Sequence, residues 1–509
     1  MRAKRFLASS FARTLETIVS IVAGLIMMPL MIRLLGEDLY GIWIVIGSII
    51  GSLYLFDIGM ASSVTRFISF SLSRDDREQA TRVVSTAFAI YSCLALIVFA
   101  ASVIIAFFSG YIVENPDNTR LVQILIIIVG MNVAVEFPFK SYAGIAGYHL
   151  RQDLMSYSQI IFRILGAALT AYLLYAGYKL IAVALVQFTV SLLSNLVFRY
   201  IAYYLEPKLR VRLKTVDRPT FKEIFGFSSW SFVIDLTRLL KERGDVWMVA
   251  AFTSPALLTV YYVGVRLVEY SNQLLYKAFG FTLPLYTEAI AREDDQELER
   301  KVKLFLRLNT LVSGIVLIGA VLFGRDVIRI WMGDSFSAAD AAIVFIVLLA
   351  AKLLVFITNP FTNVLFAMAK HRYQAYVSGA EAITSLALIP VFMQVLDNPL
   401  LAAALAIGLP FTITRTLIVP FIVQRNTRLS VALLYKTLLP LVIPILVFGY
   451  LCHLLLATVA PSAMTLLALL GFIALIGVVY GAFVLLILLT GEERQLLLKG
   501  LGVRGKKQA

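Results

Sequence analysis

Charged residues are scarce in this sequence: Asp, Glu, Lys and Arg make up 15% of the 509 residues, whereas 60% are hydrophobic. Soluble domains carry about 25% charged residues, so an ordinary soluble enzyme and a disordered chain are both excluded. The only cysteines, Cys93 and Cys452, lie inside apolar stretches, which excludes a disulfide framework. The only histidines, His149, His371 and His453, are scattered along the chain and form no metal-ligand cluster.

Long apolar runs are what the sequence does contain. Each is long enough to cross a hydrocarbon core of about 30 Å, and continuous runs favour helices over the alternating strands of a membrane barrel. The sequence therefore predicts an all-α polytopic membrane protein with about fourteen transmembrane helices, and at least twelve. The expected ranges are 8–35, 41–69, 83–112, 120–147, 156–176, 180–203, 225–252, 256–287, 304–325, 339–369, 373–396, 399–423, 431–457 and 464–490.

The basic residues predict how these helices are oriented. The net charge is +14, and with the N-terminus inside, the cytoplasmic segments hold 26 Lys and Arg against 5 on the opposite side. This asymmetry follows the positive-inside rule, so both termini are expected in the cytoplasm. The basic N-terminus resembles a signal peptide, but Arg13 and Glu16 interrupt its apolar region, and a retained first helix is expected instead.

The chain also resembles itself. The segment 73–82 (SRDDREQATR) resembles 291–300 (AREDDQELER), with Arg74, Asp75, Asp76 and Arg82 aligned with Arg292, Glu293, Asp294 and Arg300. A second match, at a slightly larger offset, aligns Pro138-Phe139, His149, Gln152 and Ser156 with Pro360-Phe361, His371, Gln374 and Ser378. The two matches predict that helices 1–6 and 7–12 are parallel copies with a central site between them. Chance similarity in a biased composition is the alternative.

Charged side chains at bilayer depth cost at least about 2.5–3.5 kcal/mol each, so they are expected to face the bundle interior or a water-filled cavity. With about 100° of rotation per residue, polar residues gather on one face of helices 1, 7 and 8, and helix 2 adds two charges. The members are Arg13, Glu16, Thr17, Ser20 and Gly24; Asp57 and Arg66; Asp235, Arg238, Lys241, Glu242 and Asp245; and Arg266, Glu269, Tyr270, Gln273 and Lys277. Together they predict a polar lumen.

Structural pairing is the alternative explanation for these charges. Asp235 with Arg238, Arg266 with Glu269, and Arg13 with Glu16 are spaced i,i+3 and could neutralise each other. Six further charges lie on other helices, where pairing inside the bundle is expected: Glu136, Lys140, Arg163, Lys352, Glu381 and Arg415. For any one residue both interpretations stay open, while a solvated pathway is favoured for the set.

No nucleotide or nucleophile motif accompanies the charges. A G-x-S-x-G elbow is absent. Residues 500–507 (GLGVRGKK) lack the final Ser or Thr of a P-loop and are interpreted as a basic tail on the inner surface. No cofactor is expected. Transport would then run on a gradient of H⁺ or Na⁺, on membrane potential or on consumption of the product.

Two segments resemble a known family. In residues 29–43 (PLMIRLLGEDLYGIW) a Leu-Gly turn precedes Tyr40-Gly41, and in 56–66 (FDIGMASSVTR) Asp57-x-Gly59 precedes Arg66. Asp245, Tyr261-Tyr262 and the Ile-Trp-Met-Gly sequence at 330–333 add to the likeness. The chain thus resembles the polysaccharide-transport family, the O-antigen and exopolysaccharide flippases of the multidrug/oligosaccharidyl-lipid/polysaccharide (MOP) exporter superfamily. A plain physical interpretation also exists, because Gly36 and Gly41 permit a tight turn between helices.

The resemblance implies a fold and an activity. It implies two six-helix lobes, 1–210 and 211–424, forming a V around a central polar cavity, with helices 13 and 14 and a basic cytoplasmic tail in 425–509. It implies a flippase rather than an enzyme. The substrate would be an undecaprenyl-diphosphate-linked oligosaccharide, carried by alternating access to the outer leaflet of a bacterial inner membrane for lipopolysaccharide or exopolysaccharide synthesis. Expected partners are membrane lipids and polysaccharide polymerase or assembly proteins, and no nucleic acid.

The same resemblance assigns roles to the lumen charges. Arg binds phosphate oxygens bidentately, so cations are the candidates for holding the diphosphate. These candidates are Arg266, Lys277, Arg66, Arg238 and Arg13. The ion-coupled members of the superfamily suggest three carboxylates as sites for a coupling H⁺ or Na⁺, namely Asp57, Asp235 and Asp245.

Three other functions compete with this one. A flippase for the peptidoglycan precursor lipid II would carry the same diphosphate and tail. A cation-coupled multidrug or small-molecule exporter would belong to the same superfamily, although such proteins typically stop at twelve helices. A membrane enzyme such as a polysaccharide polymerase would need a catalytic loop outside the bilayer, and no external loop here exceeds about 15 residues.

Overall fold

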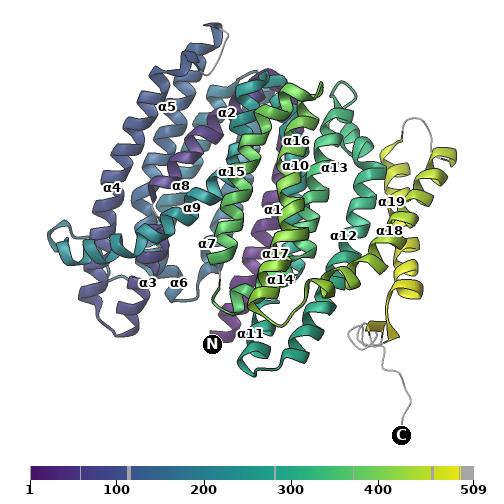
Figure 1. Ribbon diagram of the computed structural model, residues 1–509. Coiled ribbons are helices and arrows are strands. Elements are labelled where there is room, and N and C mark those ends of the chain that lie inside the picture. The colour runs from purple at the N-terminus through teal and green to yellow at the C-terminus, as the bar shows by residue number, and fades with distance from the viewer. Residues whose placement is uncertain are drawn as a thin grey trace. The chain divides into compact units, whose positions relative to one another are not determined.

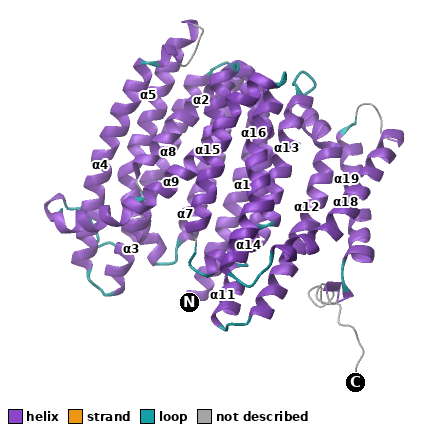
Figure 2. Ribbon diagram, in the orientation of Figure 1, coloured by secondary structure: helices purple, strands orange, loops and turns teal. Residues whose placement is uncertain are grey.

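The computed structural model describes residues 2–57, 59–111, 116–279, 282–370, 372–459, 464–491 and 493–494. Side chains are described for these residues except 2–7, 111, 116–117, 143, 226–235 and 278–279. All regular secondary structure in these ranges is helical, with no strand (Figure 2). The all-α prediction is confirmed, while the basic tail and His371 lie outside the described residues.

The helices follow one another with short connections. Their bounds are α1 (Arg2–Leu35), α2 (Glu37–Ser52), η1 (Leu53–Asp57), α3 (Met60–Ser73), α4 (Arg77–Phe107), η2 (Ser109–Tyr111), α5 (Pro116–Phe139), η3 (Lys140–Tyr142), α6 (Ala143–Tyr148), α7 (Gln152–Tyr175), α8 (Leu180–Leu205), η4 (Leu213–Thr215), α9 (Arg218–Phe252), α10 (Pro255–Phe279), α11 (Leu283–Ala291), α12 (Asp295–Met332), α13 (Ala338–Ile357), α14 (Asn359–Ala367), α15 (Arg372–Val395), α16 (Pro399–Ile413), η5 (Thr414–Ile418), α17 (Val419–Asn426), α18 (Val431–Val459), α19 (Leu466–Phe483) and η6 (Val484–Leu488).

Within the described residues, 12 helical segments are long and apolar enough to cross a membrane. They correspond to the expected helices 1–6 and 9–14, so this is a multi-pass membrane protein. The expected helices 7 and 8 are present as α9 and α10, with 35 and 25 residues, but both are too polar to be counted among these segments. The count of fourteen spans therefore stays a prediction.

Four expected helices are broken where a continuous span was predicted. The second span is α2–η1–α3 and the fourth is α5–η3–α6, while the eighth and tenth divide into α10–α11 and α13–α14. Gly59 interrupts the second with a φ of 66°, and proline stands at or beside the other breaks, as Pro138, Pro284 and Pro360. The left-handed backbone and the missing N–H of proline both end a helix. The second and fourth spans are thus broken in both predicted copies.

The first sequence match corresponds to two turns of the same geometry. Asp75 and Glu293, which the sequence match aligns with each other, are both left-handed, with φ of 57° and 56°. The next residue in each turn, Asp76 or Asp294, caps the following helix by accepting a hydrogen bond of 2.9 Å from a backbone N–H in its first turn. Such a cap satisfies one of the free N–H groups at the start of a helix.

The second match is displaced from its turn. The left-handed residues here are Leu150 and Ala369, with φ of 54° and 57°. The sequence alignment instead pairs Leu150 with Arg372, which begins the helix after the second turn. The two turns again have the same backbone geometry. However, the sequence match does not pair their left-handed residues, because it aligns Leu150 with Arg372 and not with Ala369.

Contacts divide the chain into two units, Met1–Thr259 and Val260–Ala509. In the first unit α4 packs along α5 and α1 along α7, and α8 packs against both α5 and α7 (Figure 1). In the second unit α13 packs against α12 and α16, and α18 and α19 pack against α12. The expected lobe boundaries at residues 210 and 424 remain predictions.

The two glycines of the first motif have different structural roles. Gly36 joins α1 to α2 with a φ of 87°, which confirms the predicted tight turn. Gly41 lies inside α2, where a Cβ would stand 2.0 Å from the carbonyl oxygen of Pro255. Gly41 therefore serves a close approach of α2 to the start of α10, and the prediction of a turn at this position is wrong.

Candidate substrate-binding site

The break in the second span places a carboxylate against a lysine. Asp57 ends η1, and its Oδ2 accepts a hydrogen bond of 2.9 Å from Nζ of Lys140, the first residue of η3. Asp57 Oδ1 accepts a second, of 2.8 Å, from the Tyr91 hydroxyl. Both charged side chains are mostly buried, with 17% and 20% exposed. The expected pairing of Lys140 inside the bundle is confirmed, and its partner is a predicted ion-coupling residue.

The same lysine connects this ion pair to a second carboxylate. Lys140 Nζ lies 4.8 Å from the ring centroid of Tyr54 and 4.7 Å from that of Phe137. A cation is attracted to the face of an aromatic ring at such distances. The Tyr54 hydroxyl donates a hydrogen bond of 2.6 Å to Glu136 Oε2. The network therefore ends at Glu136, whose charge no described cation neutralises by an ion pair.

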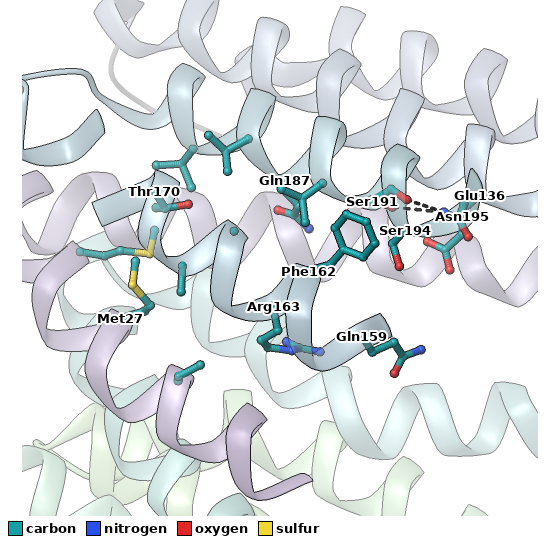
Figure 3. A pocket seen from close by; sticks show the side chains of 18 of the residues that line it. Met27, Glu136, Gln159, Phe162, Arg163, Thr170, Gln187, Ser191, Ser194 and Asn195 are labelled. Atoms are coloured by element: carbon teal, nitrogen blue, oxygen red, sulfur yellow. Dashed lines mark hydrogen bonds between the residues drawn. The ribbon is translucent and has the colours of Figure 1, made fainter. Parts of the chain in front are cut away.

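Glu136 opens onto a cavity of about 530 Å³ between α1, α2, α5, α7 and α8 (Figure 3). Its polar lining comes from α5, α7 and α8. These residues are Glu136, Gln159, Arg163, Thr170, Gln187, Ser191, Ser194 and Asn195. Trp43, Phe162 and Phe198 add aromatic surface. Pockets that bind small molecules combine a mostly apolar wall with a few converging polar groups, and this cavity has that composition.

Arg163 is the cation that lines this cavity. It lies near the middle of α7, and its side chain is exposed to the cavity. Among the described residues, no hydrogen bond or ion pair to its guanidinium is formed. The expectation that Arg163 is paired inside the bundle is therefore wrong for the part of the chain that the structure describes.

The predicted diphosphate-binding residues of the first unit lie on three helices. Arg13 on α1, Arg66 on α3 and Arg238 on α9 are all exposed, and the Arg66 guanidinium stands 6.0 Å from the ring of Phe67. Asp245 is half-buried and accepts the N–H of Val246 at 2.8 Å. The side chain of Asp235, and with it the expected pair with Arg238, lies outside the described side chains. Whether the three cations bind substrate remains a prediction.

The other two predicted cations lie on α10, in the second unit. Arg266 forms an ion pair of 2.5 Å with Glu269, one turn along the helix, and also bonds the Tyr262 hydroxyl. This confirms that the i,i+3 charges here neutralise each other. Lys277 is exposed near the end of the same helix. Their roles toward a substrate likewise remain predictions.

A second pair of expected internal charges is fully buried in this unit. Arg415 and Glu381 are 1% and 0% exposed and lie 2.9 Å apart, between α15 and the π-helical turn η5. Thr414 and Gln374 add hydrogen bonds to the pair, but Arg415 Nε has no partner among the described residues. Lys352 lies 4.2 Å from the ring centroid of Phe411. The predicted pairing of Glu381 and Arg415 is confirmed.

Several cavity residues escaped the sequence analysis because they are uncharged. Gln159 stands one turn before Arg163 on α7, and Gln187, Ser191 and Asn195 follow one another at four-residue spacing on α8. This spacing puts each set on one helix face. Polar uncharged residues at helical spacing within an apolar run could therefore have indicated that this helix face lines a polar cavity. Among the described residues no group of three or more His, Cys, Asp or Glu could hold a metal ion.

Comparison with known proteins shows consistent similarity to transporters. Residues 30–341 match the family model described as "Polysaccharide biosynthesis protein". A Shigella flexneri protein named as a candidate O-antigen transporter is 22% identical over 384 residues, covering 74% of this chain and 87% of that protein.

Solved structures show the same fold at low identity. The lipid II flippase MurJ in an inward closed conformation has a TM-score of 0.67 and 15% identity, covering 94% of this chain and 98% of that one. An inward-facing multidrug resistance MATE family transporter of the MOP superfamily has a TM-score of 0.66 and 12% identity, covering 83% and 96%. The predicted MOP-type fold is confirmed.

Proposed function

Because the chain belongs to the polysaccharide biosynthesis protein family, we propose that it is a flippase for surface polysaccharide synthesis. The substrate is a polyprenyl-diphosphate-linked oligosaccharide, moved by alternating access from the cytoplasmic to the outer leaflet of a bacterial inner membrane. The family match over residues 30–341, more than half of the chain, is the observation that carries this proposal. The relative named for O-antigen transport supports the polysaccharide branch.

The physics of the membrane explains why such a protein needs polar helices. A sugar diphosphate loses its hydration when it enters hydrocarbon, and burying polar groups without partners costs several kcal/mol each. Charged residues along α1, α3, α9 and α10 supply groups that can replace this water. We assign Arg13, Arg66, Arg238, Arg266 and Lys277 to the diphosphate, because cations form charge-assisted hydrogen bonds with phosphate oxygens. The lipid tail stays in the bilayer.

The energy source proposed here is an ion gradient. Asp57, Asp235 and Asp245 are the proposed sites for a coupling H⁺ or Na⁺. Of these, Asp57 already has a counter-charge in the structure, because Lys140 Nζ lies 2.9 Å from its carboxylate. A coupling cation at Asp57 would have to displace or share that lysine. Both termini are proposed to face the cytoplasm, and a polysaccharide polymerase is the proposed downstream partner.

Deletion of the gene in its own host tests the proposal. We expect a viable strain that lacks one surface polysaccharide and accumulates the lipid-linked repeat unit on the cytoplasmic side. Lipid extraction with mass spectrometry measures the intermediate, and a plasmid copy of the gene should restore the polysaccharide. An unchanged polysaccharide and an unchanged pool of intermediate would refute the proposal.

The likeness to the lipid II flippase structure supports a second candidate function. The same deletion separates the two, since a lipid II flippase would be required for cell-wall synthesis, so its loss would cause lysis with accumulated lipid II. The likeness to a multidrug transporter supports a third. A small-molecule exporter would leave both lipid pools unchanged and raise resistance to cationic dyes when overexpressed.

A further inference from the structure

Arg163 lines the cavity of the first unit without a described partner, in the middle of an apolar membrane helix. A charge at this depth is expensive, and such residues usually face a pathway or pair with another group. Asp57, Lys140 and Glu136 in the same unit all have hydrogen-bond partners. The free guanidinium is therefore available to an anionic group that enters the cavity from outside the protein.

The cavity also presents amide groups with unused hydrogen-bonding capacity. Gln159 and Gln187 make no hydrogen bond to any described residue. Asn195 donates through Nδ2 to the Ser191 carbonyl at 3.0 Å, which leaves its Oδ1 without a bond to the described chain. Amides and carboxylates both bind hydroxyl groups. A hydroxyl donates one hydrogen bond to an amide or carboxylate oxygen, and it accepts hydrogen bonds from an amide N–H. A hydroxyl-rich ligand would satisfy this wall better than an apolar one.

These groups are arranged in order along the cavity (Figure 3). Met27 and Thr170 lie at one end, Arg163, Phe162 and Gln187 in the middle, and Glu136, Ser194 and Asn195 at the other end. The acidic end is unsuited to phosphate because Glu136 would repel it. An anionic group is thus favoured in the middle and neutral hydroxyl groups at the Glu136 end.

An apolar groove continues from the opposite end of the cavity. It has a volume of about 460 Å³ between α1 and α7, and its walls include Ile18, Val22, Ile26 and Ile164. The groove and the polar cavity share Ala23, Met27 and Ala167 as lining residues, so they adjoin each other at this end. Three regions therefore follow in sequence: an apolar groove, a lone cation and a wall of amides with a carboxylate.

We propose that the first unit by itself contains a binding site for a lipid-linked saccharide. The isoprenoid chain lies in the α1–α7 groove, a phosphate is bound by Arg163, and sugar hydroxyls are bound by Gln159, Asn195 and Glu136. This inference rests on the proposed function for the identity of the ligand. It adds a site lined by α1, α5, α7 and α8 that includes none of the five cations assigned above to the diphosphate.

Photo-crosslinking of the full chain in phosphatidylcholine nanodiscs tests this site. The probe is farnesyl-diphosphate-linked N-acetylglucosamine with a diazirine on its terminal isoprene, and labelled residues are mapped by mass spectrometry. We expect labels within residues 18–30 and 164–171. Arg163→Gln should reduce labelling at least tenfold, which corresponds to losing roughly one charge-assisted hydrogen bond. Arg199→Gln on α8, which does not line the cavity, is the matched control and should label normally.

A sugar-free probe separates recognition of the head from recognition of the chain. Gln159→Leu and Asn195→Leu should weaken labelling by the saccharide probe but leave labelling by the same probe without sugar unchanged. Arg163→Gln should keep or raise the melting temperature, since it removes a charge with no described partner, so lost labelling would not reflect unfolding. Labels elsewhere in the chain, or equal displacement of the probe by phosphatidylglycerol, would overturn the proposal.

The gene deletion tests the flippase function and the photo-crosslinking tests the binding site, so either proposal can be rejected without the other. A gene deletion that accumulates the lipid-linked repeat unit, combined with labels outside α1 and α7, would retain the flippase function and reject this site. Labels at the predicted residues, combined with an unchanged polysaccharide in the deletion strain, would retain the site and reject the flippase function.

Discussion

Lys140 and Asp57, 2.9 Å apart, form an ion pair between the break in the fourth membrane-spanning segment and the break in the second. In a continuous α-helix, the backbone groups at these two positions would hydrogen-bond within their own helix. The short 3₁₀ turns η1 and η3 instead bring a charged side chain of each span to the other. The pair therefore links the interruptions of two membrane-spanning segments.

Removing one partner of this pair should destabilise the protein. Asp57→Asn leaves the Lys140 ammonium uncompensated, which we expect to cost about 3 kcal/mol of unfolding free energy, as for other mostly buried pairs. Thermal unfolding in detergent measures the loss. Asp75→Asn, whose side chain is 87% exposed, is the control and should change stability by less than about 0.5 kcal/mol.

The double variant Asp57→Asn with Lys140→Met separates structure from ion coupling. Because it removes both charges, most of the lost stability should return. If Asp57 binds the coupling ion, transport will stay abolished although the melting temperature recovers. Recovery of both, measured as surface polysaccharide in the deletion strain, would show that the pair is only structural.

Gly41→Ala should disrupt the contact between α2 and the start of α10. A Cβ at position 41 would stand 2.0 Å from the Pro255 carbonyl oxygen, and backbone atoms cannot be displaced as cheaply as a side chain. We expect a loss of about 1–3 kcal/mol, the usual cost of overpacking. Gly47→Ala, on the same helix with nothing within 4 Å of its Cβ, should be neutral or slightly stabilising. Equal melting temperatures for the two variants would contradict this.

Glu381→Ala should be among the most damaging single substitutions in the second unit. It leaves the Arg415 guanidinium, which is 1% exposed, without its carboxylate, at an expected cost of about 3–5 kcal/mol. Expression yield and thermal unfolding measure this cost. Glu78→Ala, whose side chain is 77% exposed, is the matched control. A variant with wild-type stability would mean that Arg415 finds another partner.

Glu493 gives the protein an acid-sensitive contact near its C-terminal end. Burial opposes ionisation and raises the pKa of this carboxyl, but hydrogen bonds from Arg307 and from the Thr490 backbone prevail and hold the pKa below its ordinary value. Arg307 binds both carboxylate oxygens, at 2.6 and 3.0 Å. Because the folded-state pKa is lowered, the contribution to stability is complete above the ordinary glutamate pKa of about 4.3 and is lost as the pH falls through the lowered value.

Glu493→Gln should therefore lower the melting temperature at pH 7, and the difference from the wild type should shrink as the pH falls below about 4. Melting curves of both proteins between pH 3.5 and 7 measure this dependence. Glu299→Gln, at an exposed position of α12, is the matched control for the substitution itself and should leave the melting temperature at pH 7 unchanged. A constant gap between wild type and Glu493→Gln across the range would show that the carboxylate charge is irrelevant to the contact.

Hydropathy predicted the helices because a membrane span must be long, apolar and internally hydrogen-bonded. The ends of α8 and α18 fall within two residues of the expected ones. The helix breaks could not be predicted in the same way. A 3₁₀ turn such as η1 keeps the apolar composition of its span, and hydropathy does not record a change of backbone hydrogen bonding.

The ion-pair partner of a charged residue was harder to predict from the sequence than the helix on which the residue lies. Arg266 and Glu269 are one helix turn apart, so their ion pair follows from spacing alone. Asp57 and Lys140 are 83 residues apart, and their contact depends on how the spans pack. Arg163 and Lys140 both lie in apolar membrane segments, yet only Lys140 has a carboxylate partner among the described residues.

The polarity of α9 and α10 bears on how the chain is made. A charged residue at the centre of a helix adds about 2.5–3.5 kcal/mol to the free energy of insertion by the translocon, and neither helix is apolar enough to offset its charges. In the part of the chain that the structure describes, six apolar spans precede these two helices and six follow them. During synthesis, α9 and α10 should therefore wait at the translocon and enter the bilayer with neighbouring helices. Insertion of the middle of the protein then depends more on neighbouring helices than insertion of the apolar spans does.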